Sequence, residues 1–226
     1  MSVGNLFRPH ASLGLGVVAG LLALVSPLGS MTHACSHPPG KDVYELRHEL
    51  AGEIGQQTVT YSCEGEDLVI ETEIEGEATM FSVPIYQMSG NYREVWRGDR
   101  LISFDSRVND NGELFEVKAR AEGEHTVIDR RRGTIEAPGT IISDLPWNHE
   151  VIDRKLLFDA RRGKLRHVEI EPAGKDTLTI GGRKVPAQKY IMTGDLERVL
   201  WYGEDGSWLQ SQLPYRGSKV FVTRRS

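Results

Sequence analysis

Hydrophobic and polar residues alternate most regularly between Tyr92 and Glu122. In the last part of this stretch, every second residue is apolar and the residues between are charged, the apolar ones being Phe115, Val117, Ala119 and Ala121. A period of two, with one buried face and one solvent-exposed face, is typical of an antiparallel strand that covers a core. Asn111 and Gly112 precede this strand and supply the positive φ angles of a two-residue hairpin. We therefore expect a three-stranded meander here, at the centre of a larger sheet.

Short apolar or alternating runs recur roughly every eight to twelve residues along the rest of the chain, with Gly-rich turns between them. Pro84 lies inside one run and cannot donate to a ladder, so we expect an edge, a bulge or a bend there. No alternation of strands with helices appears, which argues against a doubly wound nucleotide-binding sheet. Further strands are expected at residues 43–50, 58–63, 68–75, 79–86, 126–130, 134–137, 156–158, 165–170, 177–180, 185–193, 198–202, 208–213 and 220–223.

Residues 140–151 are the one segment whose pattern indicates a helix. Ser143 or Asp144 can cap it, Pro146 fits its first turn, and Trp147 and Val151 are four positions apart. The chain is therefore predicted to be an all-β protein. Its strongly curved antiparallel sheet of ten or more strands would form a half-barrel or a barrel, with one short α-helix.

The first 34 residues differ from the rest in composition. Arg8 is the only charged residue before Lys41, and an unbroken run of small and apolar residues spans 11–25. This order is typical of a secretory signal peptide, and the run is shorter than the ~20 residues of a membrane anchor. We predict a signal peptide at 1–34, a lead-in at 35–41, and one β domain at 42–226, exported to the periplasm or the cell exterior. Uncleaved anchoring is the alternative.

Cys35 and Cys63 are the two cysteines of the chain. In an oxidising compartment they are expected to form one disulfide. The alternative is that Cys35 becomes a lipidated first residue. Ala34 fits a lipoprotein signal but Thr32 does not, so the disulfide is favoured. We expect no metal site, because His33 and His37 flank Cys35 at a spacing that we attribute to chance.

Composition and charge restrict the classes of function. The formal net charge is −5, and Lys and Arg are spread along the chain, so a nucleic-acid partner is disfavoured. No serine lies in a Gly-x-Ser-x-Gly frame, and no phosphate-binding loop is present. Asp153 stands where a zinc protease would need its second histidine after His149. No cofactor is expected.

Glu94 is the main candidate for chemistry because Tyr92 and Trp96 share its face of the predicted strand. A carboxyl group held between aromatic side chains on an inward face has a raised pKa, since burial disfavours its charged form. An enzyme would then use Glu94 with His149 or Asp105 as acid and base. The other interpretation pairs Glu94 with a nearby arginine.

Aromatic residues on the strands and the helix suggest a ligand site. If a strongly bent sheet closes on one short helix, the helix does not fill the whole concave face. An apolar cleft then remains for an acyl chain or another apolar ligand. In the alternative, these side chains simply pack together. The basic turns at 130–132 and 161–162 would contact anionic lipid headgroups or, as we favour, water. The residues predicted to bind ligand are Tyr92, Glu94, Trp96, Phe104, Phe115, Trp147 and Trp201.

Several motifs, mostly Trp and Gly at turns, resemble those of a known family. They are E-x-W-x-G-x-x-L from Glu94 and N-D-N-G from Asn109, Leu145-Pro146-Trp147, Leu157-Phe158-Asp159 with Gly163, Gly194-Asp195-Leu196, and Leu200-Trp201-Tyr202 before Asp205-Gly206-Ser207-Trp208. Over residues 42–223 the chain resembles the exported bacterial family called domain of unknown function 6134. The resemblance implies a curved antiparallel sheet around a helix, similar to the half-barrel of lipoprotein carriers. It implies no activity or catalytic residue.

Three functional hypotheses follow. The first is a non-enzymatic envelope protein that binds a lipid, another apolar or amphiphilic small molecule, or an envelope protein in its concave face. The second is the enzyme described above, and the third is a structural module whose concave face is fully packed. Contact with the membrane is expected only through the signal sequence or a lipidated Cys35.

Overall fold

Strands make up most of the computed structural model, which describes residues 35, 39–80, 83–215 and 217–225. These residues belong to one compact unit, 32–226. The predicted signal peptide at 1–34 lies outside the described residues. In the part of the chain that is described, no helix is both long enough and apolar enough to cross a membrane.

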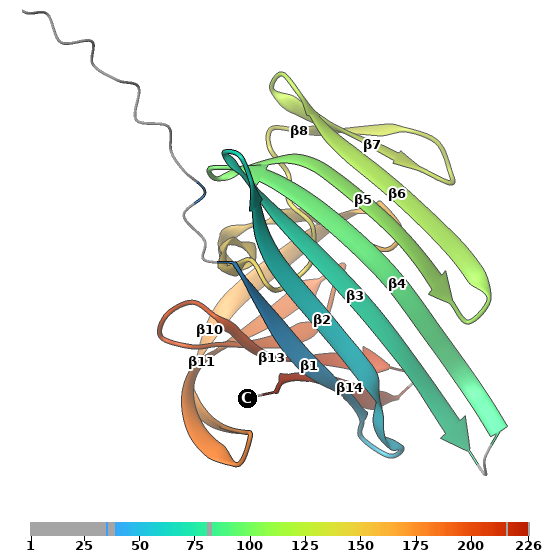
Figure 1. The fold of residues 1–226 in the computed structure, drawn as a ribbon, viewed down its shortest axis with the longest axis vertical. Helices are drawn as coiled ribbons and strands as arrows, with labels where there is room; N and C mark the ends of the chain where they lie inside the picture. Colours follow the sequence, from blue (N-terminus) through green and yellow to red (C-terminus); the bar gives the residue numbers. More distant parts are fainter. Residues whose placement is uncertain (1–34, 36–38, 81–82, 216, 226) are drawn as a thin grey trace, which may run out of the picture. The chain divides into compact units, whose positions relative to one another are not determined.

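Fourteen strands of the described chain form one antiparallel sheet, which Figure 1 shows from one side. They are β1 (Gly40–His48), β2 (Gly52–Glu64), β3 (Asp67–Met80), β4 (Val83–Arg97), β5 (Arg100–Asp110), β6 (Glu113–Glu122), β7 (His125–Arg130), β8 (Ile135–Pro138), β9 (Leu156–Phe158), β10 (Leu165–Ile180), β11 (Arg183–Gly194), β12 (Arg198–Tyr202), β13 (Trp208–Tyr215) and β14 (Ser218–Arg224). The prediction of an all-β protein is confirmed.

Neighbouring strands in the sheet are also neighbours along the chain, except where β1 pairs with β14. In that pair, Tyr44 lies opposite Arg224 and Leu46 lies opposite Val222. The two ends of the sheet are therefore β8 and β9, and the sheet is not closed into a barrel. The expectation that residues 92–122 form the centre of the sheet is wrong: β4, β5 and β6 lie toward one end, and β1 and β2 are in the middle.

The hairpin between β5 and β6 shows how the sequence directs local structure. Asn111 and Gly112 have φ angles of 54° and 90°, the values that the predicted two-residue turn requires. The amide of Gly112 also donates a hydrogen bond of 2.8 Å to the side chain of Asn109. Beyond the turn, Val117 and Ala119 are buried on the inward face. The alternation predicted for this strand is confirmed.

Three boundaries differ from the prediction. The segments 165–170 and 177–180 are one strand, β10, because Ala173 and Gly174 are absorbed as a bulge rather than forming a turn. The run 79–86 contains the end of β3 and the start of β4, with an irregular register where Thr79 faces Pro84. The strand expected at residues 43–50 ends at His48, and Leu50 beyond it is 83% exposed.

The prediction of an α-helix at residues 140–151 is wrong in both the type and the position of the helix. Residues 149–153 form a short 3₁₀-helix, η1 (His149–Asp153), and the residues before it are irregular. Asn148 caps η1 by accepting a hydrogen bond of 2.9 Å from the amide of Glu150, so neither Ser143 nor Asp144 is the cap. The Ser143 hydroxyl instead donates to Glu94, and the Asp144 carboxylate binds Arg198 and the amide of Ala160.

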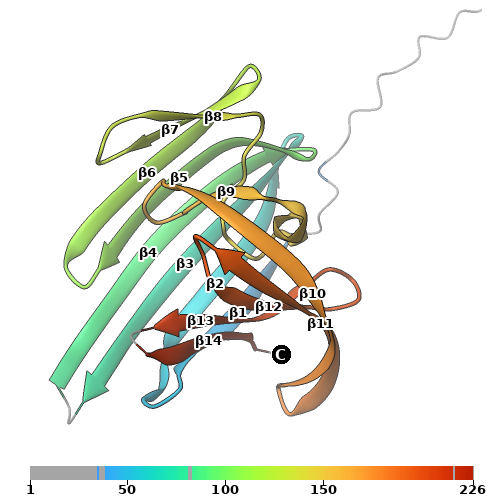
Figure 2. The same ribbon diagram turned by 180° about the vertical axis from the view of Figure 1, so that it is seen from behind.

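The sheet curves until distant strands meet. Tyr86 on β4 and Tyr215 on β13 are five places apart in the strand order, yet their ring centroids are 5.3 Å apart. Figure 1 shows β1–β6 in front of β10–β13, and Figure 2, from the opposite side, shows β10–β13 in front. The main hydrophobic core lies between these two halves of the sheet, and its large fully buried side chains include Tyr44, Phe104, Phe158 and Tyr202.

Candidate functional site

The connection between β8 and β9, residues 139–155, crosses the concave face of the sheet and is called the strap below. Its apolar side chains Ile141, Ile142 and Val151 are buried in the main core. On one side of the concave face, Trp147 of the strap contacts β4, and on the other the hydroxyl of Tyr202 on β12 donates to the carbonyl of Pro146 at 2.9 Å. The strap thus joins the two halves of the sheet.

Glu94 on β4 is buried, and three side chains donate hydrogen bonds to its carboxylate. The Ser143 hydroxyl donates to Oε1 at 2.5 Å, the Trp147 indole donates to Oε2 at 2.5 Å, and the Trp96 indole lies 3.4 Å from Oε2. The alternation of β4 places Tyr92, Glu94 and Trp96 on the inward face, as predicted. The interpretation that an arginine neutralises Glu94 is wrong, because its described partners are neutral donors.

Burial raises the pKa of Glu94 to about 7, although the hydrogen bonds from Ser143, Trp147 and Trp96 act in the opposite direction. Desolvation disfavours the carboxylate, whereas donors stabilise it. The result is a carboxyl group that titrates near neutral pH and fastens the strap to the sheet. Of the two interpretations of Glu94, the structure supports the buried carboxyl group with a raised pKa.

Neither proposed acid–base partner lies beside Glu94. Asp105 follows the inward-facing Phe104 on β5, so it points to the opposite face, where it pairs with Lys118 at 3.7 Å. The imidazole of His149 packs edge-on against Tyr202, with ring centroids 4.8 Å apart, and against Tyr190 at 6.2 Å. The hypothesis of a Glu94 pair with Asp105 or His149 is therefore wrong in its geometry.

Most of the predicted ligand-binding aromatics pack against one another. The Trp147 ring lies edge-on to Trp96, with centroids 5.6 Å apart, and the Phe104 ring lies edge-on to Phe158 at 4.9 Å. This part of the concave face is filled. Of the predicted residues, only Tyr92 lines the cavity described below.

Trp201 belongs to a different apolar cluster. It packs with Leu178, Ala187 and Leu209, whereas its neighbours Leu200 and Tyr202 lie in the main core. Its indole donates to Asp176 at 3.0 Å. The expectation that Trp201 faces the concave side is wrong, since successive residues of a strand point to opposite faces.

A cavity of about 720 Å³ occupies the part of the concave face that the strap leaves open. One of its walls is apolar and takes side chains from six strands, β1, β2, β3, β4, β13 and β14. They include Leu46, Ile54, Ile74, Met88, Leu213 and Val220. Gly76 adds to the hollow, because a Cβ there would make only ordinary contacts, 3.5 Å from Ile54 O and 3.7 Å from Leu46 Cδ2.

The other wall of the cavity is polar and is built on the turn between β9 and β10. Asp159 organises this turn, since its Oδ1 accepts from the amides of Arg161 and Arg162 at 3.1 and 2.9 Å. The Ser106 hydroxyl ties the turn to β5 through a bond of 2.7 Å to Ala160 O. Arg161, Arg162 and other charged side chains therefore face the apolar wall across the cavity.

Salt bridges hold much of the polar wall in place. Arg166 donates to Asp159 at 2.7 Å, and Arg198 donates to Asp144 at 2.5 Å. Burial alone would raise the pKa of Asp159, but Arg166 and the amide of Arg162 outweigh it and hold that pKa below its usual range. Asp159 thus stays ionised as the counter-charge of Arg166.

Sequence reasoning missed most of the cavity. The sequence predicts a solvated turn at 161–162, with contact to a lipid headgroup as the alternative. Phe115, predicted to bind ligand, instead lies under this turn: Arg162 stands 4.9 Å from its ring centroid and Arg161 stands 5.9 Å away. No local signal places this turn opposite β1–β4, since the contact depends on the strap and the β1–β14 pairing.

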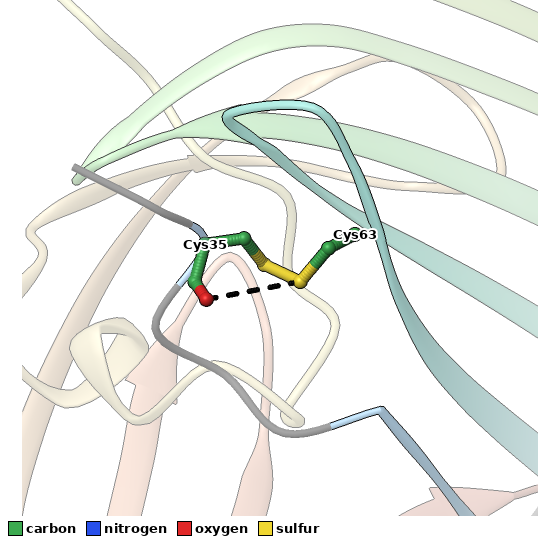
Figure 3. Close-up of a disulfide and its surroundings, with 2 residues drawn as sticks. All are labelled: Cys35 and Cys63. Carbon is green, nitrogen blue, oxygen red and sulfur yellow. Dashed lines mark hydrogen bonds between the residues drawn. A yellow bond between two sulfur atoms is a disulfide. The ribbon is translucent and has the colours of Figure 1, made fainter. Parts of the chain in front are cut away.

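Cys35 and Cys63 form the predicted disulfide, drawn in Figure 3. It links the beginning of the described chain to the end of β2. The thiol that lipidation of Cys35 would require is occupied in this structure. Among the described residues, no group of three or more His, Cys, Asp or Glu side chains is placed to hold a metal ion. The histidines at 33 and 37 lie outside them.

Comparison with known proteins supports the fold. A family model described as Domain of unknown function (DUF6134) matches residues 50–225. The chain is also similar to a crystal structure described as a beta-barrel-like protein of domain of unknown function DUF1849 from Brucella abortus. That similarity has a TM-score of 0.59 at 14% identity, covering 82% of this chain and 95% of the other. No curated protein sequence matches significantly.

Proposed function

The chain belongs to the DUF6134 family, and from the structure we propose that it is a non-enzymatic, exported protein that binds an amphiphilic small molecule in the concave cavity. The observation that carries this proposal is the cavity itself. Its volume of about 720 Å³ falls within the roughly 300–1,000 Å³ of sites for small organic ligands.

The two walls of the cavity favour a ligand with two kinds of surface. Side chains such as Ile74, Met88 and Leu213 are only partly buried, and covering them would remove apolar surface from water. The arginines and aspartates of the opposite wall would bind a polar group. A wholly apolar ligand would leave the polar wall without a partner, so an amphiphile fits better.

The other two hypotheses are less well supported. A structural module with a fully packed concave face would not leave a cavity of this size. An enzyme based on Glu94 would need a substrate beside that carboxyl, but Ser143, Trp147 and Trp96 occupy its surroundings and it does not line the cavity. Binding without chemistry is therefore the function that the geometry supports best.

Export is part of this proposal and rests on two observations. The disulfide between Cys35 and Cys63 is typical of an oxidising compartment. The composition of residues 1–34 is typical of a secretory signal. An envelope location would give the protein access to amphiphiles.

The proposal is tested by titrating the exported, processed protein with N-phenyl-1-naphthylamine, an uncharged fluorescent probe of apolar sites. We expect saturable binding. Gly76→Phe places a ring in the cavity and should weaken binding at least about tenfold. Glu77→Phe is the matched control, because the next residue of β3 is exposed on the opposite face.

Circular dichroism of both variants would show whether the sheet is retained. Saturable binding by the wild type and Glu77→Phe, lost in a folded Gly76→Phe, is the expected result. Absence of saturable binding by the wild type, or equal binding by a folded Gly76→Phe, would contradict a ligand site in this cavity.

A further inference from the structure

Arg162 is the member of the polar wall whose charge is least satisfied. Its nearest carboxylate oxygen, Asp110 Oδ2, is 3.8 Å from Nη2, beyond hydrogen-bond distance. Its Nε is buried and has no partner, and within the described chain its guanidinium donates no hydrogen bond. A guanidinium carries five N–H donors. Arg162 lines the cavity, and the N–H donors of its two terminal nitrogens have no hydrogen-bond acceptor among the described residues.

The carboxylate nearest to Arg162 is already occupied. Asp110 forms a closer ion pair with Arg161 and accepts a hydrogen bond of 2.8 Å from the Tyr86 hydroxyl. Arg166 and Arg198 each have their own aspartate, Asp159 and Asp144. The four arginines of this wall thus share three aspartates, which leaves one positive charge in excess.

One acidic residue of the cavity lining remains to be counted. Glu113 accepts a hydrogen bond of 3.2 Å from Arg131, which is exposed in the turn after β7. Glu113 is therefore neutralised by an arginine that does not line the cavity. Among the described residues, Arg161 and Arg162 therefore have one carboxylate between them within ion-pair distance, that of Asp110.

Aromatic packing fixes the direction of the unsatisfied guanidinium. The guanidinium carbon of Arg162 lies 4.9 Å from the ring centroid of Phe115, which is half-buried on β6. This cation–π contact restricts the Arg162 side chain, so less conformational entropy is lost when a ligand binds. Arg162 is thus prepared to bind a planar or tetrahedral anion through two of its N–H groups.

We propose that the ligand of this cavity is an anionic amphiphile with a single alkyl chain, whose carboxylate or phosphate binds Arg162. This inference rests on the function proposed above and specifies its ligand class. The alkyl chain lies along the apolar wall formed by residues such as Ile54, Ile74 and Met88. One chain with a compact headgroup suits a cavity of about 720 Å³.

Isothermal titration calorimetry with four dodecyl probes, each below its micelle concentration, tests the headgroup separately from the chain. The probes are dodecanoate, dodecyl phosphate, dodecyltrimethylammonium and the uncharged dodecyl glucoside. We expect both anionic probes to bind about tenfold or more tighter than the uncharged one, and the cationic probe to bind most weakly. The tighter of the two anions distinguishes a free fatty acid from a phosphate headgroup.

Variants of Arg162 connect this preference to one side chain. Arg162→Gln should lower the affinity for both anionic probes to about that for dodecyl glucoside. Arg162→Lys should retain part of the advantage, because it keeps the charge but loses the planar fork. Arg132→Gln is the matched control, since Arg132 is exposed in a turn and does not line the cavity.

The possible outcomes test the anionic headgroup separately from the proposed binding function. Equal binding of all four probes, or an anion preference that survives in a folded Arg162→Gln, would overturn the assignment of an anionic headgroup and leave the binding function intact. Tighter binding of the cationic probe would overturn it as well. A protein that binds neither the dodecyl probes nor N-phenyl-1-naphthylamine would overturn both.

Discussion

The indole nitrogen of Trp147 donates a hydrogen bond of 2.5 Å to the carboxylate of Glu94, and this bond fastens the strap to β4. Ser143, also on the strap, donates to the other oxygen of the same carboxylate. One buried acid therefore holds two points of a segment that has no regular structure at that place. The strap fills one part of the concave face and leaves the rest open as a cavity. Because Glu94 holds the strap in place, it also helps to set the position of that cavity.

Glu94 should make the stability of the protein depend on pH. Its folded pKa of about 7 lies above the ordinary value of 4.5, so the folded state binds the proton more tightly between these pH values. The free energy of unfolding should therefore fall as pH rises from about 4.5 to about 7, by roughly 3 kcal/mol, and then level off. Urea denaturation at pH 5 and pH 8 measures this difference.

Glu94→Gln provides the control for the pH effect. The carboxamide keeps an oxygen that can accept from Trp147 but does not titrate, so the difference between pH 5 and pH 8 should shrink by about that amount. Other titrating groups are common to both proteins and cancel in the comparison. The same pH dependence in both proteins would show that Glu94 is not the group responsible.

Trp147→Phe should destabilise the protein by about 1–3 kcal/mol at pH 8, because it removes a donor from a buried carboxylate. The pKa of Glu94 should also rise further, which moves the loss of stability to higher pH. Trp201→Phe is a matched control, since it removes an indole bond to Asp176 on the exposed part of the β10–β11 hairpin. Equal losses in the two variants would indicate that ring volume matters and the bond to Glu94 does not.

Asp144→Ala should cost about 3–5 kcal/mol, because it leaves the charge of the largely buried Arg198 without its partner. It also removes the acceptor of the Ala160 amide, which Asp144 Oδ1 binds at 2.8 Å. The double variant Asp144→Ala with Arg198→Met should recover part of this loss in a denaturant titration. A double variant less stable than Asp144→Ala alone would contradict a penalty from unpaired charge.

Replacing both cysteines with serine should lower the free energy of unfolding by about 2–4 kcal/mol, since Cys35 and Cys63 close a loop over a separation of 28 residues. The wild type treated with a reductant should show a similar loss, and the serine variant should not respond to the reductant. Thermal denaturation with and without the reductant compares them. An unchanged wild type under complete reduction would show that the disulfide contributes little.

Local patterns predicted the strands well because each depends on adjacent residues. The Asn111-Gly112 turn and the buried Val117 followed directly from alternation and turn chemistry. The raised pKa of Glu94 was one of two open interpretations, because Tyr92 and Trp96 mark its face of β4 but nearby arginines offered it a partner. The pairing of β1 with β14 did not follow, because no local rule selects partners separated by almost the whole domain, as Tyr44 and Arg224 are.

The cavity was only partly foreseeable for the same reason. An open cleft was one of the two alternatives predicted for the concave face. Six of the seven residues predicted to bind ligand, however, do not line the cavity. Large aromatics such as Phe104 and Trp147 fill space, so they mark the packed part of the concave face. The open part is lined by medium-sized side chains and by Gly76, which give no distinctive signal in a sequence.

Native mass spectrometry of the protein purified from the envelope of its own cells tests the central claim most directly. The account predicts a population with the added mass of one anionic, single-chain amphiphile, present in the wild type and in Glu77→Phe and absent from a folded Gly76→Phe. Only the bare protein mass in the wild type, under conditions that preserve a non-covalent complex in a control protein, would contradict it.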